Sequence, residues 1–287
     1  MKDLVYFFHL SRPINVLISL MALLLGTFLT GVAPADFLVD AQFWYSLVAV
    51  GIISMTGYWV NDAFDFKIDR INKPRRVIVN AHLSVKIVLT VYFSLVGLLL
   101  IGSWFLQPMY LWLTNLSAAA MLFLYAAYLP RTTVVGKLVI AALTATVLYY
   151  AALLYQLTSP LLWTTVFAFQ ITFLRELVKD IEDIEGDLHF KLQTLPIRIG
   201  IVGARNVLLF AIVIMIMTTH IPFWLGFIRT GDLNWPYLAG SLALIQIPLV
   251  YLILRLRRAT QPTDFKMPSQ LLKIFILTGM LSVLFLL

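Results

Sequence analysis

Long apolar runs dominate the chain, and short polar stretches separate them. Nine runs come close to the roughly 17 to 25 residues that an α-helix needs to cross a bilayer. They cover residues 14–33, 42–61, 84–107, 109–129, 134–156, 159–178, 203–228, 236–255 and 270–287. The pattern predicts an all-α, polytopic membrane protein with nine transmembrane helices. We expect one transmembrane domain over residues 1–287, because only the connections after the second, sixth and eighth runs are long.

Composition and charge placement agree with this topology. Of the 287 residues, 61% are hydrophobic and only 12% are charged, which is far from the usage of soluble domains. With nine spans, all of the 21 Lys and Arg residues except Arg229 fall on the side of the amino terminus. Because basic loops stay in the cytoplasm, this predicts an integral cell-membrane protein with a cytoplasmic amino terminus. The same asymmetry explains the net charge of +7, so we expect no nucleic acid partner, and no protein partner can be inferred.

Two acidic motifs with equal spacing follow the second and sixth runs, on the predicted cytoplasmic side. In a helix, positions i, i+3 and i+7 fall within a sector of about 60°, so each motif directs its carboxylates to one side. Like charges on adjacent turns repel each other, and a divalent cation would relieve the repulsion. Oxygen ligands suit Mg²⁺, which typically binds a few carboxylates together with substrate phosphates. The motif residues, and hence the candidate metal ligands, are Asn61, Asp62, Asp65, Asp69, Asp180, Asp183 and Asp187.

Other acidic residues near the second motif differ in their helical positions. Glu182 and Glu185 fall on the face opposite to the motif, so we expect them to be solvated or paired with local Lys and Arg. Glu176 lies four residues before Asp180 on nearly the same face, and it is a further candidate for the site.

Basic residues on the same predicted side of the membrane could bind the negative charge of a diphosphate. A diphosphate and six carboxylates leave negative charge even with two divalent cations, so cationic side chains must supply the remainder. The alternative is that each Lys or Arg only follows the charge rule for cytoplasmic loops. The candidates from this argument are Arg70, Lys73, Arg76, Arg131 and Lys191.

The combination of motifs resembles the UbiA superfamily of intramembrane prenyltransferases over nearly the whole chain. The matching segments, besides the spans and the two acidic motifs, are Asn72-Lys73-Pro74-x-Arg76, Arg12-Pro13-x-Asn15 and Tyr125 near the end of the fourth run. The resemblance implies helices around a central, lipid-accessible cavity that receives the prenyl tail of a prenyl diphosphate donor. It also implies Mg²⁺ as the cofactor, with metal and basic residues stabilising the departing pyrophosphate while an acceptor nucleophile captures an allylic cation.

By this resemblance each candidate residue receives a role. The catalytic candidates are Asp65, Asp69, Asp183 and Asp187, which are also metal ligands. The substrate-binding candidates are Arg12, Asn15, Arg70, Lys73, Arg76, Tyr125, Arg131, Lys179 and Lys191. Two positions depart from the family pattern, which commonly has Arg-Pro in place of Arg76-Val77 and often Lys in place of Pro130. Arg131 is the candidate to replace the phosphate contact of that lysine.

The acceptor is less closely specified than the donor. The segment 175–187 is most similar to geranylgeranylglyceryl phosphate geranylgeranyltransferases, which implies transfer of a geranylgeranyl group to the hydroxyl of a membrane-embedded lipid acceptor, in ether-lipid synthesis. An aromatic prenyltransferase of quinone biosynthesis is the alternative within the family. A cation-coupled transporter is a further alternative, but it predicts charges near span centres, whereas the acidic motifs lie at span ends.

Overall fold

The computed structural model describes residues 2–72, 74, 77–128 and 134–282 of the chain. It comprises two compact units, Met1–Thr132 with Thr146–Thr158, and Thr133–Ala145 with Ser159–Leu287. Each unit is helical and has its own apolar core. The described residues form no strand, and only an isolated bridge joins Val79 and Leu83. The predicted all-α class is therefore confirmed.

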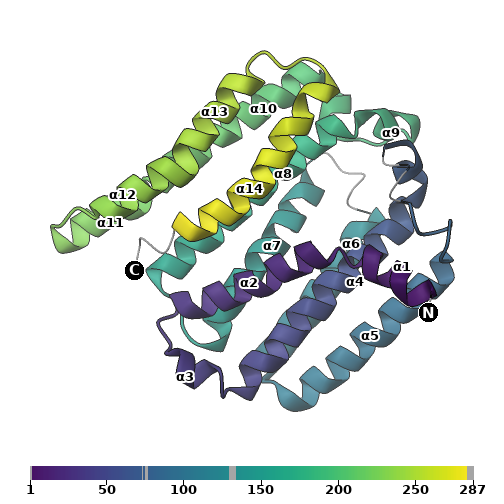
Figure 1. The fold of residues 1–287 in the computed structure, drawn as a ribbon, viewed down its shortest axis with the longest axis horizontal. Helices are drawn as coiled ribbons and strands as arrows, with labels where there is room; N and C mark the ends of the chain where they lie inside the picture. The colour runs from purple at the N-terminus through teal and green to yellow at the C-terminus, as the bar shows by residue number, and fades with distance from the viewer. Residues whose placement is uncertain (1, 73, 75–76, 129–133, 283–287) are drawn as a thin grey trace. The chain divides into compact units, whose positions relative to one another are not determined.

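The first unit is built around one long helix, α4, which packs against α1, α2, α5 and α6 (Figure 1). The second half of α7 completes the unit. Its helices are α1 (Lys2–Leu10), α2 (Pro13–Leu29), α3 (Pro34–Phe37), α4 (Ala41–Asn72), α5 (Val85–Leu106), α6 (Met109–Tyr128) and α7 (Val135–Leu154).

A buried polar network joins four helices at the end of α4 opposite to its acidic motif. The Gln107 amide is its centre, because its Nε2 donates to Ser46 Oγ at 3.0 Å and its Oε1 accepts from Ser103 Oγ at 2.8 Å. Asn115 Nδ2 also donates to Gln107 Oε1 at 2.8 Å, and the Tyr150 hydroxyl donates to Asn115 Oδ1 at 3.2 Å. Buried polar groups need such partners, so the network fixes the packing of α4 to α7 at this end.

The second unit is built around α8, which packs against α10 and α14. The start of α7 also belongs to it. Its other elements are α8 (Ser159–Glu182), α9 (Ile184–His189), α10 (Leu195–Thr219), α11 (Ile221–Thr230), α12 (Trp235–Ser241), the π-helix η3 (Leu242–Gln246), α13 (Ile247–Leu256), the 3₁₀-helix η4 (Pro262–Phe265) and α14 (Lys266–Ser282).

Helix α10 contains a kink at Gly200, whose φ of 74° suits a residue without a Cβ. The apolar run predicted at 203–228 begins just after this kink and continues into α11. Residues 195–199 therefore form a separate helical turn that leads from α9 to the span.

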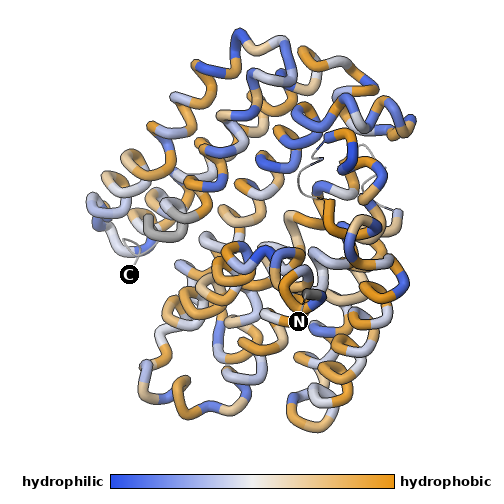
Figure 2. The backbone as a smooth tube through the Cα atoms, turned by 45° about the vertical axis from the view of Figure 1, so that its right-hand side comes forward, coloured by the Kyte–Doolittle hydropathy of each residue, from blue (hydrophilic) through white to orange (hydrophobic). Residues whose placement is uncertain are grey.

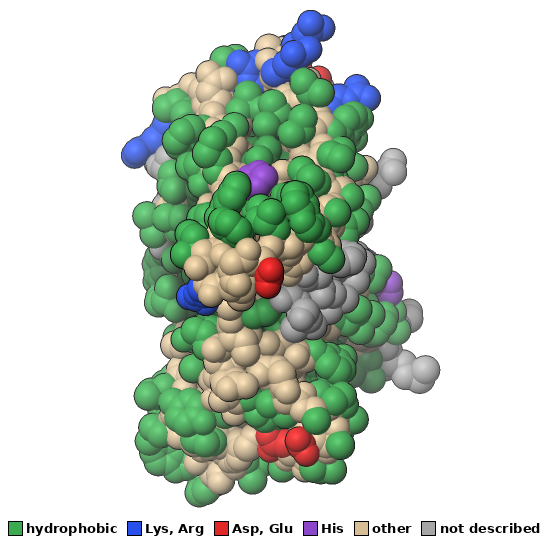
Figure 3. All heavy atoms as spheres, turned by 90° about the vertical axis from the view of Figure 1, so that its left-hand side faces the viewer, with side chains coloured by type: hydrophobic (Ala, Val, Ile, Leu, Met, Phe, Trp, Pro, Cys, Tyr) green, Lys and Arg blue, Asp and Glu red, His purple; other side chains and the backbone are tan. Residues whose placement is uncertain are grey.

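Seven described helices are long and apolar enough to cross a membrane, and an eighth span results if α1 and α2, which meet at a bend of 52°, are counted as one. The ninth predicted span, 270–287, overlaps α14, but the described part of α14, Lys266–Ser282, has only 17 residues. The count of nine is therefore not confirmed. Figure 2 shows apolar residues along much of the long helices, and Figure 3 shows a face covered largely by hydrophobic side chains, as expected of a protein in contact with lipid.

Candidate functional site

The first acidic motif lies on the last turns of α4. The predicted apolar run ends at residue 61, but the helix continues to Asn72, since residues 61–72 contain neither Gly nor Pro to end it. Asp62, Asp65 and Asp69 are half-buried on this extension. Asn61 Oδ1 is buried, and no described residue donates a hydrogen bond to it.

Arg12 reaches the first motif from the break between α1 and α2. Its backbone is left-handed, with φ 46°, and Pro13 begins the next helix. The Arg12 guanidinium donates to the Asp62 carboxylate, and its central carbon lies 4.9 Å from the centre of the Tyr58 ring. The structure thus brings together two predicted site residues that are 50 positions apart in the sequence.

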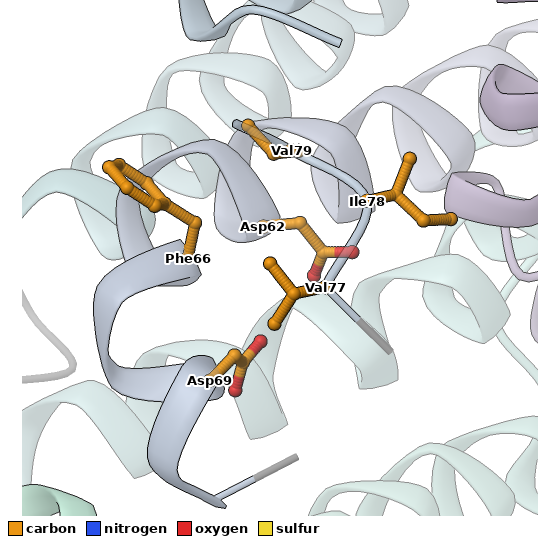
Figure 4. Close-up of a pocket in the computed structure, with 6 residues that line it drawn as sticks. All are labelled: Asp62, Phe66, Asp69, Val77, Ile78 and Val79. Carbon is orange, nitrogen blue, oxygen red and sulfur yellow. The ribbon is translucent and has the colours of Figure 1, made fainter. Parts of the chain in front are cut away.

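A small pocket lies beside the first motif (Figure 4). Figure 4 shows the carboxylates of Asp62 and Asp69 on the side of α4 that faces residues 77–79, with Val77 next to both. Phe66, Ile78 and Val79 supply the rest of the lining. The pocket therefore combines two acidic side chains with an apolar wall.

The second acidic motif spans the junction of α8 and α9. Asp183 separates the two helices with φ −92° and ψ 8°, outside regular helical values. The backbone hydrogen bonds nevertheless continue, from Asp183 N to Lys179 O at 2.9 Å and from Asp187 N to Asp183 O at 3.2 Å. The second motif is therefore not one regular helix, because the distorted residue Asp183 separates Asp180 on α8 from Asp187 on α9.

Lys137 on α7 lies at the second motif, a place that the sequence argument did not assign to it. Its side chain is 5% exposed, and its Nζ lies 2.8 Å from Asp180 Oδ2. The available signal was its position inside an apolar run, since a lysine within a predicted span is usually functional and paired. Sequence alone did not identify the partner, 43 residues further along the chain, because the pair depends on how α7 packs.

The glutamates near the second motif differ in exposure. Glu176 is buried, and its Oε1 lies 3.3 Å from Arg175 Nη1. Glu185 is exposed, and Glu182 is half-buried. The motif therefore has a buried acidic side and a solvated one.

Asp187 lies outside the spans in an environment that disfavours its charged form. Burial, followed by the repulsion of the Asp183 carboxylate, raises the pKa of Asp187 to about 6. The nearby Thr194 side chain and the charges of Lys137 and Lys179 act in the opposite direction. The carboxylate form thus needs more positive charge than the protein alone supplies, and a divalent cation could supply it.

The remaining predicted residues are more scattered. Asn15 is half-buried in the first turn of α2, and Tyr125 is half-buried near the end of α6. Arg70 is exposed, with its Nη2 3.5 Å from the Asn80 carbonyl oxygen, and Lys191 is exposed after α9 with φ 52°. Three predicted residues lie outside the described part of the chain, namely Lys73, Arg76 and Arg131.

The donor set of the two motifs fits Mg²⁺. Among the described residues, no three His, Cys, Asp or Glu side chains are grouped so that they could hold a metal ion by themselves. Mg²⁺ rarely needs such a group, because it keeps waters and takes one or two carboxylates plus substrate phosphates. The orphaned Asn61 Oδ1 and the buried Asp187 carboxylate are oxygens of the required kind.

Comparison with known families gives one match that covers most of the chain. Residues 19–284 match the model of the UbiA prenyltransferase family.

Archaeal relatives with one shared name are similar to the chain over most of their length. The digeranylgeranylglyceryl phosphate synthase of Sulfurisphaera tokodaii is 32% identical over 87% of each chain. The synthase of the same name from Metallosphaera sedula is 35% identical over 75% of this chain and 77% of its own. That of Methanopyrus kandleri is 26% identical over 97% of both.

Solved structures share the fold at lower sequence identity. A structure concerned with digeranylgeranylglyceryl phosphate synthase in membranes has a TM-score of 0.74 and 24% identity, covering 99% of this chain and 98% of the other. A UbiA homologue from Archaeoglobus fulgidus, bound to GPP and Mg²⁺, has a TM-score of 0.64 and 17% identity, covering 97% and 99%. At these identities the similarity establishes the fold alone.

Proposed function

The chain belongs to the UbiA prenyltransferase family, and from this premise we propose that it transfers a geranylgeranyl group from its diphosphate to the free hydroxyl of geranylgeranylglyceryl phosphate. The observation that carries the proposal is the near full-length similarity to relatives named digeranylgeranylglyceryl phosphate synthase. The chain is therefore a membrane-bound prenyltransferase of ether-lipid synthesis.

The two acidic motifs act on the donor through Mg²⁺, which the homologue from Archaeoglobus fulgidus binds together with GPP. When bound, Mg²⁺ supplies positive charge that stabilises the departing diphosphate. The oxygens that would hold it belong to Asn61, Asp62, Asp65, Asp69, Asp180, Asp183 and Asp187. Support comes from the burial of Asp187 and from the orphaned Asn61 oxygen.

The reaction exchanges one carbon–oxygen bond for another. The bond between C1 of the donor and its diphosphate oxygen breaks, and both electrons remain with the diphosphate. The acceptor hydroxyl oxygen then forms a bond to C1 and releases its proton. Charge stabilisation of the leaving group is the main requirement, which is why cationic residues are needed beside the carboxylates.

Basic residues complete the binding of the two substrates. Arg12 would bind the diphosphate of the donor at the first motif, since its guanidinium already contacts Asp62. Lys179 and Lys191 have the corresponding role at the second motif, where the charge of Lys179 lowers the pKa of Asp187. The acceptor carries a phosphate of its own, and the same proposal assigns the other basic candidates, with Asn15 and Tyr125, to substrate contacts. These other basic candidates are Arg70, Lys73, Arg76 and Arg131.

The proposed setting is a cell membrane, with the amino terminus and both motifs on the cytoplasmic side. The distribution of Lys and Arg supports this orientation. Donor and acceptor are both lipids, so both would enter from the bilayer, and the prenyl tail would occupy an apolar cavity within a single transmembrane domain.

Acceptor competition tests the proposal. Purified protein in lipid is incubated with geranylgeranyl diphosphate, Mg²⁺ and one of three acceptors: geranylgeranylglyceryl phosphate, its dephosphorylated analogue or 4-hydroxybenzoate. Mass spectrometry should detect an ether product from the first acceptor and much less from the second. Prenylation of the benzoate alone would reject the lipid acceptor and assign the chain to quinone synthesis.

A further inference from the structure

Lys137 places a buried ammonium group inside the second acidic motif. Among the Lys and Arg residues that the structure describes, it is the one that is buried. Its Nζ lies 2.8 Å from Asp180 Oδ2, and the Asp180 side chain is only 14% exposed. Removing two charges from water is costly unless they pair well, so Lys137 and Asp180 each depend on the other to stay charged.

The surroundings of the pair are acidic and closely coupled. Glu176 and Asp187 are buried in the same unit. Arg175 is engaged with Glu176 at 3.3 Å, whereas Lys137 is engaged with Asp180 and also lowers the pKa of Asp187. Lys137 is therefore the buried cation that interacts with the carboxylates of the motif, Asp180 and Asp187.

A divalent cation that enters this motif alone would meet the ammonium group. The two positive charges repel each other, and the repulsion is weakly screened in a buried site. A metal-bound diphosphate differs, because its oxygens offer the lysine a new anionic partner. The lysine side chain is a flexible point charge on a four-carbon stem, so it can exchange one anion for another without bidentate geometry.

We infer that Lys137 is the resident counter-ion of the second acidic motif, neutralising Asp180 in place of a metal until a metal-bound diphosphate arrives. The inference rests on the proposed function and deepens it, because it makes tight metal binding depend on the donor. Premature metal binding to the empty enzyme is thereby disfavoured.

The test measures metal binding in the absence of turnover. Mn²⁺ is titrated into the purified native protein and into Lys137→Gln, which removes the charge but keeps a hydrogen-bond donor for Asp180. In the absence of the prenyl diphosphate, the affinity of Lys137→Gln for Mn²⁺ should exceed that of the native protein by about tenfold or more, since one repelling charge is gone. Arg198→Gln removes an exposed charge in the helical turn after α9 and should change the affinity by less than about threefold, because solvent screens it.

A second pair of measurements separates the role of the ion pair from general effects on folding. Lys137→Met leaves Asp180 buried without its partner and should lower the thermal unfolding temperature, which Mn²⁺ should restore. The double variant Lys137→Met with Asp180→Asn should unfold near the native temperature without metal. A thiolodiphosphate analogue of the donor should tighten Mn²⁺ binding more in the native protein than in Lys137→Gln.

Unchanged or weaker Mn²⁺ binding by a folded Lys137→Gln protein would overturn the inference. The proposed function would still stand if the native protein bound Mn²⁺ with the donor analogue and Asp183→Asn did not. Failure of the native protein to bind Mn²⁺ even with the analogue would instead reject the proposed function.

Discussion

Asp183 and Glu185 are two residues apart but have opposite surroundings. Asp183 lies at the junction of α8 and α9 beside Asp187, whereas Glu185 is exposed on α9. Asp183→Ala should lower turnover by about 100-fold or more, because metal-borne charge stabilisation contributes several kcal/mol to the rate. Glu185→Ala, the matched control, should lower it less than about threefold, as expected of a surface charge. Steady-state assays of both folded proteins in detergent decide the matter. Equal losses of turnover would refute the assignment of Asp183 to the metal-binding side and of Glu185 to the solvent side.

The buried carboxyl of Asp187 should give the metal-free protein an identifiable pH dependence. Its pKa is raised from 3.8 to about 6, so the folded state binds this proton more tightly than the unfolded state does. The resulting stabilisation is complete below the unfolded pKa of 3.8 and is lost as the pH rises through about 6. The unfolding temperature without metal should therefore fall between about pH 4 and pH 6 and level off above about pH 7, and Mg²⁺ should restore it by binding the carboxylate.

Asp187→Asn is the control for this pH dependence. The substitution removes the titrating group, so thermal melts of the variant should show a smaller fall over the same pH range. Equal pH profiles for the two proteins would mean that another group is responsible.

At the scale of helices, the apolar runs predicted most of the long elements and some of their ends. The ranges 84–107 and 109–129 agree with α5 and α6 to within one residue at each end. Helix α4 continues for 11 residues past the end of the predicted apolar run, because polar residues without Gly or Pro can remain helical. The distortion at Asp183 has no such marker in the sequence.

Tertiary pairs were the least predictable feature of the site. Arg12 was selected by resemblance, but its contact with Asp62 depends on the left-handed turn between α1 and α2. The pairing of Lys137 with Asp180 was not predicted, because the two residues lie on different helices. Sequence spacing indicates which residues share one helix face, and it carries no information on which faces pack together.

Close packing of α2 against α7 depends on Gly26. A Cβ atom there would lie 3.0 Å from the Leu148 carbonyl oxygen and 3.1 Å from Ala151 Cβ, so the two backbones approach closely. Gly26→Val should destabilise the protein by about 1 to 3 kcal/mol, the usual cost of overpacking. Gly97→Val is the control, since nothing lies within 4 Å of its added Cβ. In thermal melts in detergent, the unfolding temperature of Gly26→Val should be lower by several degrees and that of Gly97→Val should not. Equal shifts would reject close packing as the cause.

For the whole molecule, the absence of cysteine makes the predicted topology directly testable. Asp232, in the connection between α11 and α12, and Glu185 on α9 are both exposed and are predicted on opposite sides of the membrane. In sealed, right-side-out cells, an impermeant maleimide should label Asp232→Cys, whereas Glu185→Cys should react only after the cells are opened. The reverse pattern would place the acidic motifs outside and invert the orientation.

The central claim is that this chain joins two lipids by Mg²⁺-dependent prenyl transfer. The most direct test follows radiolabelled geranylgeranyl diphosphate and geranylgeranylglyceryl phosphate with purified protein in bilayers. Measured together, ether product and free diphosphate should appear in equal amounts with Mg²⁺, and neither should form once a chelator has removed all metal. Full turnover with metal removal verified, or release of diphosphate without ether product, would contradict the account.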